Sequence, residues 1–320
     1  MNENPDSMNA PLDNRTAGHA ALVGVGLMGE AMLRRLVGRG WRVTAWDRDA
    51  PRRELARTLG ADVAATPRQA LDAADLVLMC VLDTGAVRDC VFGAGGLADG
   101  DGNAGKLLLD LSTIDPQASR DMAAQAARQA GLRWVDCPVS GGPPAAASGT
   151  LTIMAGGAPE DFQAALPVLR ELGANVTHMG PPGSGQTAKI LNQAIVGAGF
   201  ALMTEAVLLA EAAGIDAARL PQCLAGGLAD SALLQKLYPR IAERGFEPPT
   251  GYARQLHKDM EAVAAFARGH GQALPLVECT TRLYRAYIEA GHGMADSASL
   301  IRLYEAGLAA RAGGTDERLP

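Results

Sequence analysis

A single lysine, Lys189, interrupts an otherwise uncharged stretch of the chain that runs from Gly183 to Met203. The surrounding segment, 187–214, is too long for an ordinary strand and apolar on nearly every face, which predicts a helix that is buried all round or shared with a second subunit. Burying an ammonium group is costly, although a lysine near a helix start can also extend its amine to water. A buried amine with a lowered pKa could take or supply a proton, which makes Lys189 a possible acid/base, although the residues alone favour an amine that reaches water.

Two amides follow this lysine at helical spacing. Asn192 and Gln193 stand three and four residues after Lys189, and this spacing places all three side chains on one helical face. Either amide could orient a substrate oxygen or the ammonium group. The residues alone leave the division of roles between them open.

A glycine-rich turn lies near the start of the chain, where a strand leads into Gly24-x-Gly26-x-x-Gly29 and then into a helix. The first glycine permits a tight turn, the second lets the backbone approach a pyrophosphate, and the third lets the helix pack against the strand. Leu27 and Met28 open the helix, whose unpaired N–H groups and dipole favour phosphate. An ordinary glycine turn is the alternative, but the order of strand, glycines, helix, strand and acid favours a dinucleotide site.

The acid in this order is Asp47, which ends the following strand 18 residues after Gly29. A carboxylate there can bind the ribose hydroxyls of NAD and repel a 2′-phosphate. The adjacent Arg48 could instead bind that phosphate. We therefore expect NAD as the cofactor, with NADP not excluded.

A second glycine-containing loop, VSGGPPAAASG at 139–149, follows a later strand. The amides of Gly141 and Gly142, together with the Ser140 hydroxyl, could hold a carboxylate group. A surface turn made by glycine and proline is the alternative. The residues of this loop alone favour the surface turn.

Three motifs taken together resemble the β-hydroxyacid dehydrogenase family, which includes 3-hydroxyisobutyrate dehydrogenase and tartronate semialdehyde (2-hydroxy-3-oxopropionate) reductase. They are Gly24-Val25-Gly26-Leu27-Met28-Gly29, Asp136-Cys137-Pro138-Val139-Ser140-Gly141-Gly142 and Gly183-x-Gly185-x-x-x-Lys189-x-x-Asn192-Gln193. The resemblance runs from about residue 19 to 310. It implies hydride transfer between NAD(P) and a small hydroxy acid or its semialdehyde, a Ser140-Gly141-Gly142 site for the substrate carboxylate, and a catalytic role for Lys189. Gln193 stands at a position where the family more often has asparagine. The resemblance there is to the tartronate semialdehyde reductase branch, which has glutamine at this position.

The resemblance also extends to two loops beside the expected cofactor. Val81 and Leu82 match a Leu-Pro loop of the family, and because Asp83 replaces the proline we expect only backbone contacts there. Thr113 follows another strand, at the sheet edge where the nicotinamide end would lie. The alternative for this stretch is helix capping by Ser112, Thr113 or Asp115.

Lys258 and Asp259 resemble a late Lys-Asp pair of the family, in which the lysine reaches the cofactor and the acid supports the active site. A solvated helix face is the alternative. The segment before the pair is one residue shorter than usual, and Tyr252 stands near an expected phenylalanine. His257 is interpreted as structural, and no spacing of His, Asp or Glu suggests a metal site.

These side chains need two kinds of scaffold. From Ala20 to about Gly180, nearly continuous apolar runs alternate with amphipathic stretches, which predicts a mainly parallel Rossmann-type sheet buried on both faces. The expected strands are 19–25, 41–46, 75–81, 106–112, 133–139, 150–156 and 175–180. After the PPGSG turn at 181–185 only helical patterns follow, at 187–214, 216–225, 230–244, 255–269 and 275–311. We thus expect a flexible tail (1–18), a dinucleotide-binding domain (19–181), an all-helical substrate and dimerisation domain (182–312) and a second tail (313–320).

Composition excludes several classes of protein. The 320 residues carry a net charge of −6 and no basic cluster, so a nucleic-acid partner is not expected. Five scattered cysteines suggest neither a disulfide framework nor a zinc site, which fits a reducing cytoplasm. The first 18 residues lack the apolar core of a secretion signal, and no uninterrupted apolar run of about 18 residues predicts a membrane span. We expect a cytoplasmic homodimer or homotetramer acting on a small carboxylic acid. The alternatives are an imine reductase-like enzyme and a non-catalytic nucleotide-binding protein of the same fold.

Overall fold

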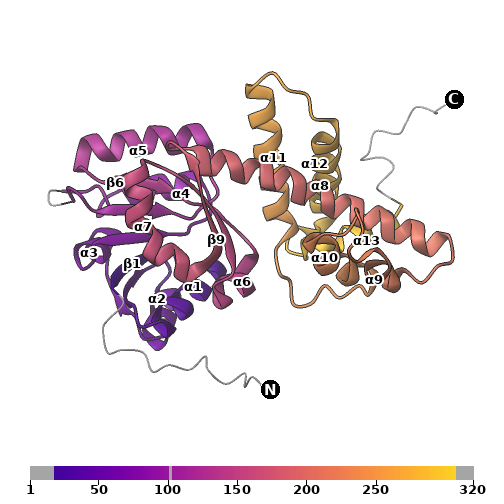
Figure 1. Ribbon diagram of the computed structural model, residues 1–320, viewed down its shortest axis with the longest axis horizontal. Helices are drawn as coiled ribbons and strands as arrows, with labels where there is room; N and C mark the ends of the chain where they lie inside the picture. The colour runs from indigo at the N-terminus through magenta and orange to yellow at the C-terminus, as the bar shows by residue number, and fades with distance from the viewer. Residues whose placement is uncertain (1–17, 101–102, 308–320) are drawn as a thin grey trace, which may run out of the picture. The chain divides into compact units, whose positions relative to one another are not determined.

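The computed structural model describes residues 18–100 and 103–307 (Figure 1), so both predicted tails lie almost wholly outside the described residues. The chain forms two compact units, the first ending at Gln186 and the second beginning at Thr187. The sequence pattern puts the change at the PPGSG turn. The division falls later because the backbone N–H groups of Gly183 and Gln186 both donate to the buried carboxylate of Asp136 in the first unit.

The first unit contains one nine-stranded sheet. Its strands are β1 (His19–Val23), β2 (Arg42–Trp46), β3 (Asp62–Val63), β4 (Leu76–Met79), β5 (Leu107–Asp110), β6 (Arg133–Asp136), β7 (Val139–Ser140), β8 (Leu151–Gly156) and β9 (Gly173–Gly180). The order β3-β2-β1-β4-β5-β6 is parallel throughout, as expected of a Rossmann domain. β8 then runs antiparallel to β6 and β7 and parallel to β9. The predicted mainly parallel sheet is confirmed.

Helices cover both faces of this sheet (Figure 1). They are α1 (Leu27–Gly38), α2 (Ala50–Thr58), α3 (Pro67–Asp72), α4 (Thr84–Phe92), α5 (Pro116–Ala130), α6 (Gly142–Ser148) and α7 (Pro159–Leu172). Alternate residues of β1 enter different cores: Ala20 and Leu22 join the core that includes α1 and α7, while Ala21 and Val23 join the core that includes α3, α4 and α5. Burial on both faces explains why the strands read as continuous apolar runs.

The second unit is helical. It contains α8 (Ser184–Ala212, whose first turn belongs to the first unit), α9 (Leu220–Leu224), α10 (Ala232–Ala242), α11 (Ala253–Gly269), α12 (Pro275–Tyr287) and α13 (Ile301–Glu305). The prediction of one helical stretch over 275–311 is wrong within 275–307, and residues 308–311 lie outside the described residues. After α12 the chain makes a π turn in which Gly291 has a φ of +94°, and a 3-10 turn at Ser297–Leu300 begins under the cap of Asp296. The helix breaks because of Gly291, Gly293 and the buried acid Asp296, which the helical pattern of the sequence did not reveal.

The long helix α8 is the core helix of this unit. Gly197 lies so close to α11 that an added Cβ would lie 2.1 Å from the sulfur of Met260, and at Gly199 it would lie 2.3 Å from the side chain of Leu233 on α10. By length and by a mean hydropathy of 1.6 over its most apolar window, α8 could also cross a membrane, and 33% of that window is buried. The two glycine contacts show that α8 packs closely against α10 and α11 within the unit.

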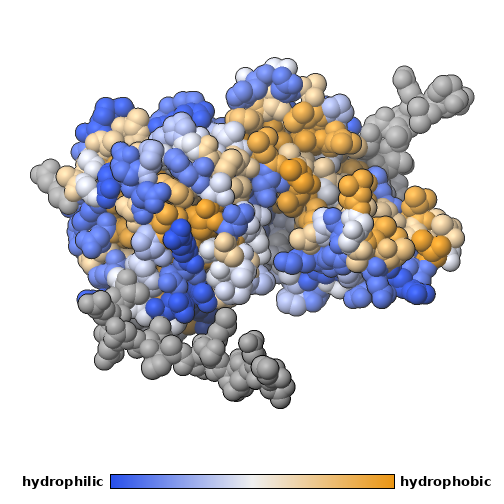
Figure 2. Space-filling model, viewed as in Figure 1, coloured by the Kyte–Doolittle hydropathy of each residue, from blue (hydrophilic) through white to orange (hydrophobic). Residues whose placement is uncertain are grey.

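One face of α8 carries exposed apolar side chains. Its members are Leu191, Ile195, Leu202 and Leu209, each more than half exposed. Their spacings of four and seven residues keep them on one side of the helix, while Lys189, Gln193 and Val207 are buried on another. Figure 2 shows apolar surface, in orange, over the helical unit. We call this set the leucine stripe.

Candidate functional site

The glycine turn has the geometry of a phosphate-binding loop. Gly24 has a φ of +95°, and a Cβ added there would lie 2.3 Å from the carbonyl oxygen of Cys80. A Cβ on Gly29 would lie 2.0 Å from the carbonyl oxygen of Gly24. These two glycines are therefore required by the packing of the fold itself.

Gly26 differs from both. An added Cβ there would meet no atom of the described chain within 4 Å, and its backbone is extended, with a φ of −69°. Next to it, Leu27 opens α1 with half of its surface exposed, and Met28 is half-buried. The fold does not need a glycine at this position, so its presence fits the close approach of a pyrophosphate to the backbone. The residues of the turn thus fit a dinucleotide.

The acid after β2 is held toward this turn. Asp47 accepts a hydrogen bond from the Val25 N–H at 2.7 Å and one from the Asp49 N–H at 2.9 Å. The guanidinium group of Arg53 donates to the backbone oxygens of Asp47 and Arg48. Each carboxylate oxygen retains further lone pairs for ribose hydroxyls. Arg48 is exposed beside it.

Two loops at the carboxyl ends of β4 and β5 are joined by a hydrogen bond. The Ser112 hydroxyl accepts from the Val81 N–H at 3.0 Å, which places the 81–83 loop beside the 112–114 loop. Leu82 is exposed, and Thr113 is half-buried. Helix capping is also present, since Asp83 caps α4 and Asp115 caps α5. Asp83 replaces the family's proline with a helix cap.

Two buried acids end the neighbouring strands β5 and β6. Asp110 and Asp136 are fully buried and face each other in register across β5 and β6. Burial raises the pKa of Asp110 to about 7 and that of Asp136 to about 6. Asp136 receives backbone N–H groups on both oxygens, whereas Asp110 accepts from the Ser112 N–H and leaves Oδ2 without a partner among the described residues. Sequence reasoning gave neither acid a role. The signal for each was an aspartate at the end of an apolar strand.

The loop predicted to hold a carboxylate lies at the start of α6. Ser140 pairs with β8, while Gly141 and Gly142 have φ values of +129° and +71°. A Cβ on Gly141 would lie 2.6 Å from the Cβ of Ala145, so glycine is required there. The first N–H groups of a helix have no acceptor within it, which leaves the Gly142 amide suited to an anion.

In the second unit, four predicted residues form one hydrogen-bonded cluster. The Lys189 ammonium donates to Gln193 Oε1 at 2.8 Å, and Asn192 donates to the same oxygen at 2.8 Å. Gln193 Nε2 in turn donates to Asp259 of α11 at 2.7 Å. Burial lowers the pKa of Lys189 to about 8, while the negative charge of Asp259 acts in the opposite direction. At neutral pH the amine is mostly protonated and needs little free energy to lose its proton.

Lys258 lies at the edge of this cluster. Its amine is 3.2 Å from Asp259 Oδ1, and its side chain is 40% exposed. Its positive charge adds to the lowering of the Lys189 pKa. His257, on the same helix, lies 3.6 Å from Glu261, and burial lowers its pKa. Nothing in this arrangement gives His257 a chemical role.

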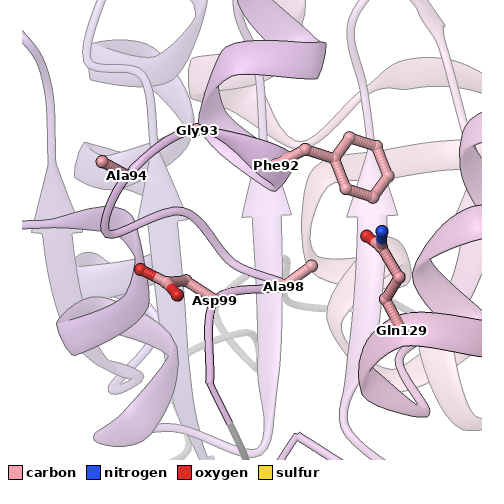
Figure 3. A pocket seen from close by; sticks show the side chains of 6 residues that line it. All are labelled: Phe92, Gly93, Ala94, Ala98, Asp99 and Gln129. Atoms are coloured by element: carbon pink, nitrogen blue, oxygen red, sulfur yellow. The ribbon is translucent and has the colours of Figure 1, made fainter.

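A separate surface pocket of about 310 Å³ lies elsewhere on the first unit (Figure 3). It is lined by Phe92, Gly93, Ala94, Ala98, Asp99 and Gln129. These residues follow or lie near the carboxyl ends of α4 and α5. In strand-helix units those ends lie at the edge of the sheet opposite the glycine turn, so the pocket is not the dinucleotide site. No group of His, Cys, Asp or Glu that could hold a metal ion occurs within the described ranges.

The fold and the glycine turn define an NAD(P)-binding oxidoreductase, and comparisons with known proteins specify it further. The family model for the NAD binding domain of 6-phosphogluconate dehydrogenase matches residues 19–180. The model for the NAD-binding of NADP-dependent 3-hydroxyisobutyrate dehydrogenase matches residues 183–304. The chain belongs to the β-hydroxyacid dehydrogenase family and is an NAD(P)-dependent enzyme.

Individual proteins agree with this assignment. The 2-hydroxy-3-oxopropionate reductase of Escherichia coli (strain K12) is 34% identical over 284 residues, covering 88% of this chain and 96% of the relative. A 3-hydroxyisobutyrate dehydrogenase structure from Salmonella typhimurium is 27% identical with a TM-score of 0.79, covering 89% and 99%. The structure of Psf3 in complex with NADP+ and 2-OPP is 25% identical with a TM-score of 0.81, covering 89% and 99%.

Proposed function

We propose that this enzyme interconverts a small hydroxy acid and its semialdehyde, of the 2-hydroxy-3-oxopropionate or 3-hydroxyisobutyrate type, with Lys189 as the general acid and base. The observation that carries this proposal is the buried Lys189 amine, with its pKa lowered to about 8 and one hydrogen bond to Gln193. A structural lysine would gain nothing from losing its contact with water. The similarity to 2-hydroxy-3-oxopropionate reductase supports the substrate class.

The first unit binds the cofactor and the substrate carboxylate. Gly24, Gly26 and Gly29 shape the phosphate loop, with Leu27 and Met28 opening the helix above it. Asp47 and Arg48 contact the adenosine ribose, and the carboxylate of Asp47 favours NAD over NADP. The loops around Val81, Leu82 and Thr113 contact the nicotinamide half. The Ser140 hydroxyl and the amides of Gly141 and Gly142 bind the substrate carboxylate.

The second unit manages the proton. When bound, the nicotinamide ring supplies or accepts the hydride at the substrate carbon. In reduction, the Lys189 ammonium donates a proton to the carbonyl oxygen as that oxygen becomes a hydroxyl. In oxidation, the neutral Lys189 amine takes the hydroxyl proton. Gln193 fixes the amine, Asn192 contacts the substrate oxygen, Asp259 anchors Gln193, and Lys258 reaches the cofactor.

Turnover of a panel of small acids and aldehydes tests this proposal. We expect oxidation or reduction with NAD(H) or NADP(H), and we expect Lys189→Met to lower kcat at least about 100-fold while cofactor binding stays within about twofold. Gln117→Met, an exposed change on α5, is a matched control. Near-normal kcat in the Lys189 variant would overturn the mechanism. Turnover of imines but not of hydroxy acids would assign the chain to the imine reductases instead.

We also propose that a second copy of the chain covers the leucine stripe of α8 in a cytoplasmic homodimer or homotetramer. Four exposed aliphatic side chains in one row form an apolar patch that a soluble monomer would rarely leave open. A symmetric pair of such helices would bury the stripe against itself. The helical domain thus serves both the substrate and assembly.

A further inference from the structure

Gln186 is a fully buried amide that holds the 112–114 loop from inside the first unit. Its side-chain oxygen accepts a hydrogen bond from the Ile114 N–H at 3.0 Å, and its Nε2 donates to the backbone oxygen of Ser112 at 2.8 Å. These two bonds reach the residues on either side of Thr113. One side chain therefore satisfies a donor and an acceptor of a loop that has no strand partner at this point.

The backbone of Gln186 is fixed as firmly as its side chain. Its N–H donates to Asp136 at 2.8 Å, and a second oxygen of Asp136 accepts from the Gly183 N–H at 2.7 Å. Asp136 ends a central strand and is itself fully buried. Gln186 therefore links the end of β6 to the 112–114 loop, through its backbone on one side and its side chain on the other.

The same connection extends to a second loop. The Ser112 hydroxyl accepts from the Val81 N–H at 3.0 Å, so the loop that Gln186 holds also holds the 81–83 loop. Both loops follow the carboxyl ends of neighbouring parallel strands, where the nicotinamide half of a dinucleotide binds in this type of sheet. The glycine turn and Asp47, which serve the adenosine half, have no hydrogen bond to Gln186 among the described residues.

We propose that Gln186 is a positioning residue for the nicotinamide half of the cofactor, acting through the backbone of the 112–114 loop and, through Ser112, on Val81. The proposal rests on the proposed function only for the role of these two loops. It adds a residue that touches neither cofactor nor substrate. Its role is to keep both loops in their binding conformation before the cofactor arrives, which reduces the ordering cost of binding.

Cofactor fragments separate this role from a general contribution to folding. NADH or NADPH, whichever binds more tightly, contacts both halves of the site, whereas ADP-ribose lacks the nicotinamide ring. Gln186→Met keeps the length of the side chain and removes both hydrogen bonds. The exposed Gln117→Met on α5 is the matched control. Calorimetric titration gives the two dissociation constants, and hydrogen exchange gives the protection of the Ile114 amide.

For Gln186→Met we expect the Kd for the reduced cofactor to rise about tenfold, because binding must then order loops that the two hydrogen bonds hold in the wild type. The Kd for ADP-ribose should stay within about twofold, and the Ile114 amide should exchange faster. An unchanged Kd for the reduced cofactor would overturn the proposal. An equal loss for both ligands would overturn it as well, because it would show a general folding defect.

Ser112→Ala gives an independent measurement if the Gln186 variant does not fold. It removes only the hydroxyl that holds Val81 and leaves the backbone bond to Gln186 in place. We expect a rise of about threefold in the Kd for the reduced cofactor with ADP-ribose unchanged. No rise would contradict the link between the two loops. Since these readouts measure binding, they stand whether or not any tested acid is turned over.

Discussion

The side-chain oxygen of Gln193 lies 2.8 Å from the ammonium nitrogen of Lys189, one turn away on the same helix. Asn192 donates to that same oxygen, and the amide nitrogen of Gln193 donates to Asp259. This arrangement bears on the division of labour between the two amides that the sequence left open. Gln193 contacts the amine directly, and Asn192 reaches the amine only through Gln193.

The two charges beside this cluster should move the pH profile in opposite directions. Burial lowers the pKa of Lys189, the charge of Asp259 raises it, and the charge of Lys258 lowers it further. In the reductive direction the protonated amine is required, so kcat/KM should fall as pH rises through about 8. Asp259→Asn should move this fall to lower pH, and Lys258→Met should move it to higher pH.

Steady-state rates from pH 6 to 10 would measure these shifts, with Glu261→Gln as a control on the same helix. The oxidative direction should show the mirror image, a rise in rate through the same pH, because it requires the neutral amine. If both variants moved the profile in the same direction, or if neither moved it, the amine that titrates would not be Lys189.

Substitutions of two glycines in the same turn should have opposite outcomes. Gly26→Ala should leave the free energy of unfolding within about 0.5 kcal/mol, because the added Cβ meets no protein atom and the backbone is extended. It should nevertheless weaken cofactor binding at least about tenfold, since the methyl group would occupy space needed by the phosphates. Thermal unfolding and calorimetric titration would measure the two effects.

Gly29→Ala is the matched comparison. Its Cβ would lie 2.0 Å from the carbonyl oxygen of Gly24, so it should destabilise the first unit by about 2 kcal/mol or more. Normal cofactor affinity in Gly26→Ala would show that the phosphates do not approach this position. The interpretation of the turn would then be wrong.

Asp110 should make the protein less stable as pH rises. Burial raises its pKa to about 7, so the folded protein keeps this proton to a higher pH than the unfolded chain does. By linkage, stability is lost progressively from about pH 4 to pH 7, by roughly 2–4 kcal/mol for this group. Asp110→Asn keeps an oxygen for the Ser112 N–H and removes the charge, so it should be more stable than the wild type at pH 8.

Urea unfolding at pH 5 and pH 8 would measure this difference. At pH 5 the two proteins should differ by less than at pH 8, because the wild-type acid is then neutral in the folded state. Asp136 titrates in the same direction and will leave part of the pH dependence in the variant. A pH dependence identical in the two proteins would show that Asp110 is not protonated at neutral pH.

The leucine stripe gives a test of assembly. Ile195→Arg places a charge in the middle of the stripe, where 73% of the isoleucine surface is exposed in the single chain. If a second copy covers this face, the variant should become monomeric with little loss of stability of the isolated chain. Light scattering after gel filtration would measure the mass. A wild-type monomer, or an oligomer unaffected by the charge, would rule out this interface.

Much of the framework follows from the sequence because its signals are local. The alternation of apolar runs with helical stretches predicted the parallel sheet, which the structure confirms. The two-residue strand β3 was missed, and the predicted strand 133–139 merged β6 with the first residue of β7. The break after α12 was missed because Gly291 lies within an otherwise helical pattern.

The candidate site shows the same difference between local signals, which the sequence carries, and long-range contacts, which it does not. Spacing along one segment and family resemblance predicted the glycine turn and the residues around Lys189 as site residues, and their roles stay predictions. Gln186 was not predicted, because its side-chain hydrogen bonds join it to the Ser112 and Ile114 backbone more than 70 residues away. The same holds for Asp136, whose partners come from the end of the first unit. Contacts between distant segments leave no periodic trace in the sequence.

The two faces of α8 place a limit on how this segment can change length. Lys189 and Gln193 point toward α11, while Leu191 and Ile195, two residues further along in each case, are exposed. Inserting one residue between Gln193 and Ile195 would rotate everything downstream by about 100°. Gly197 would then leave Met260, and a bulky side chain would replace it. Only insertions close to whole turns therefore keep the amine cluster and the packing with α11 in step.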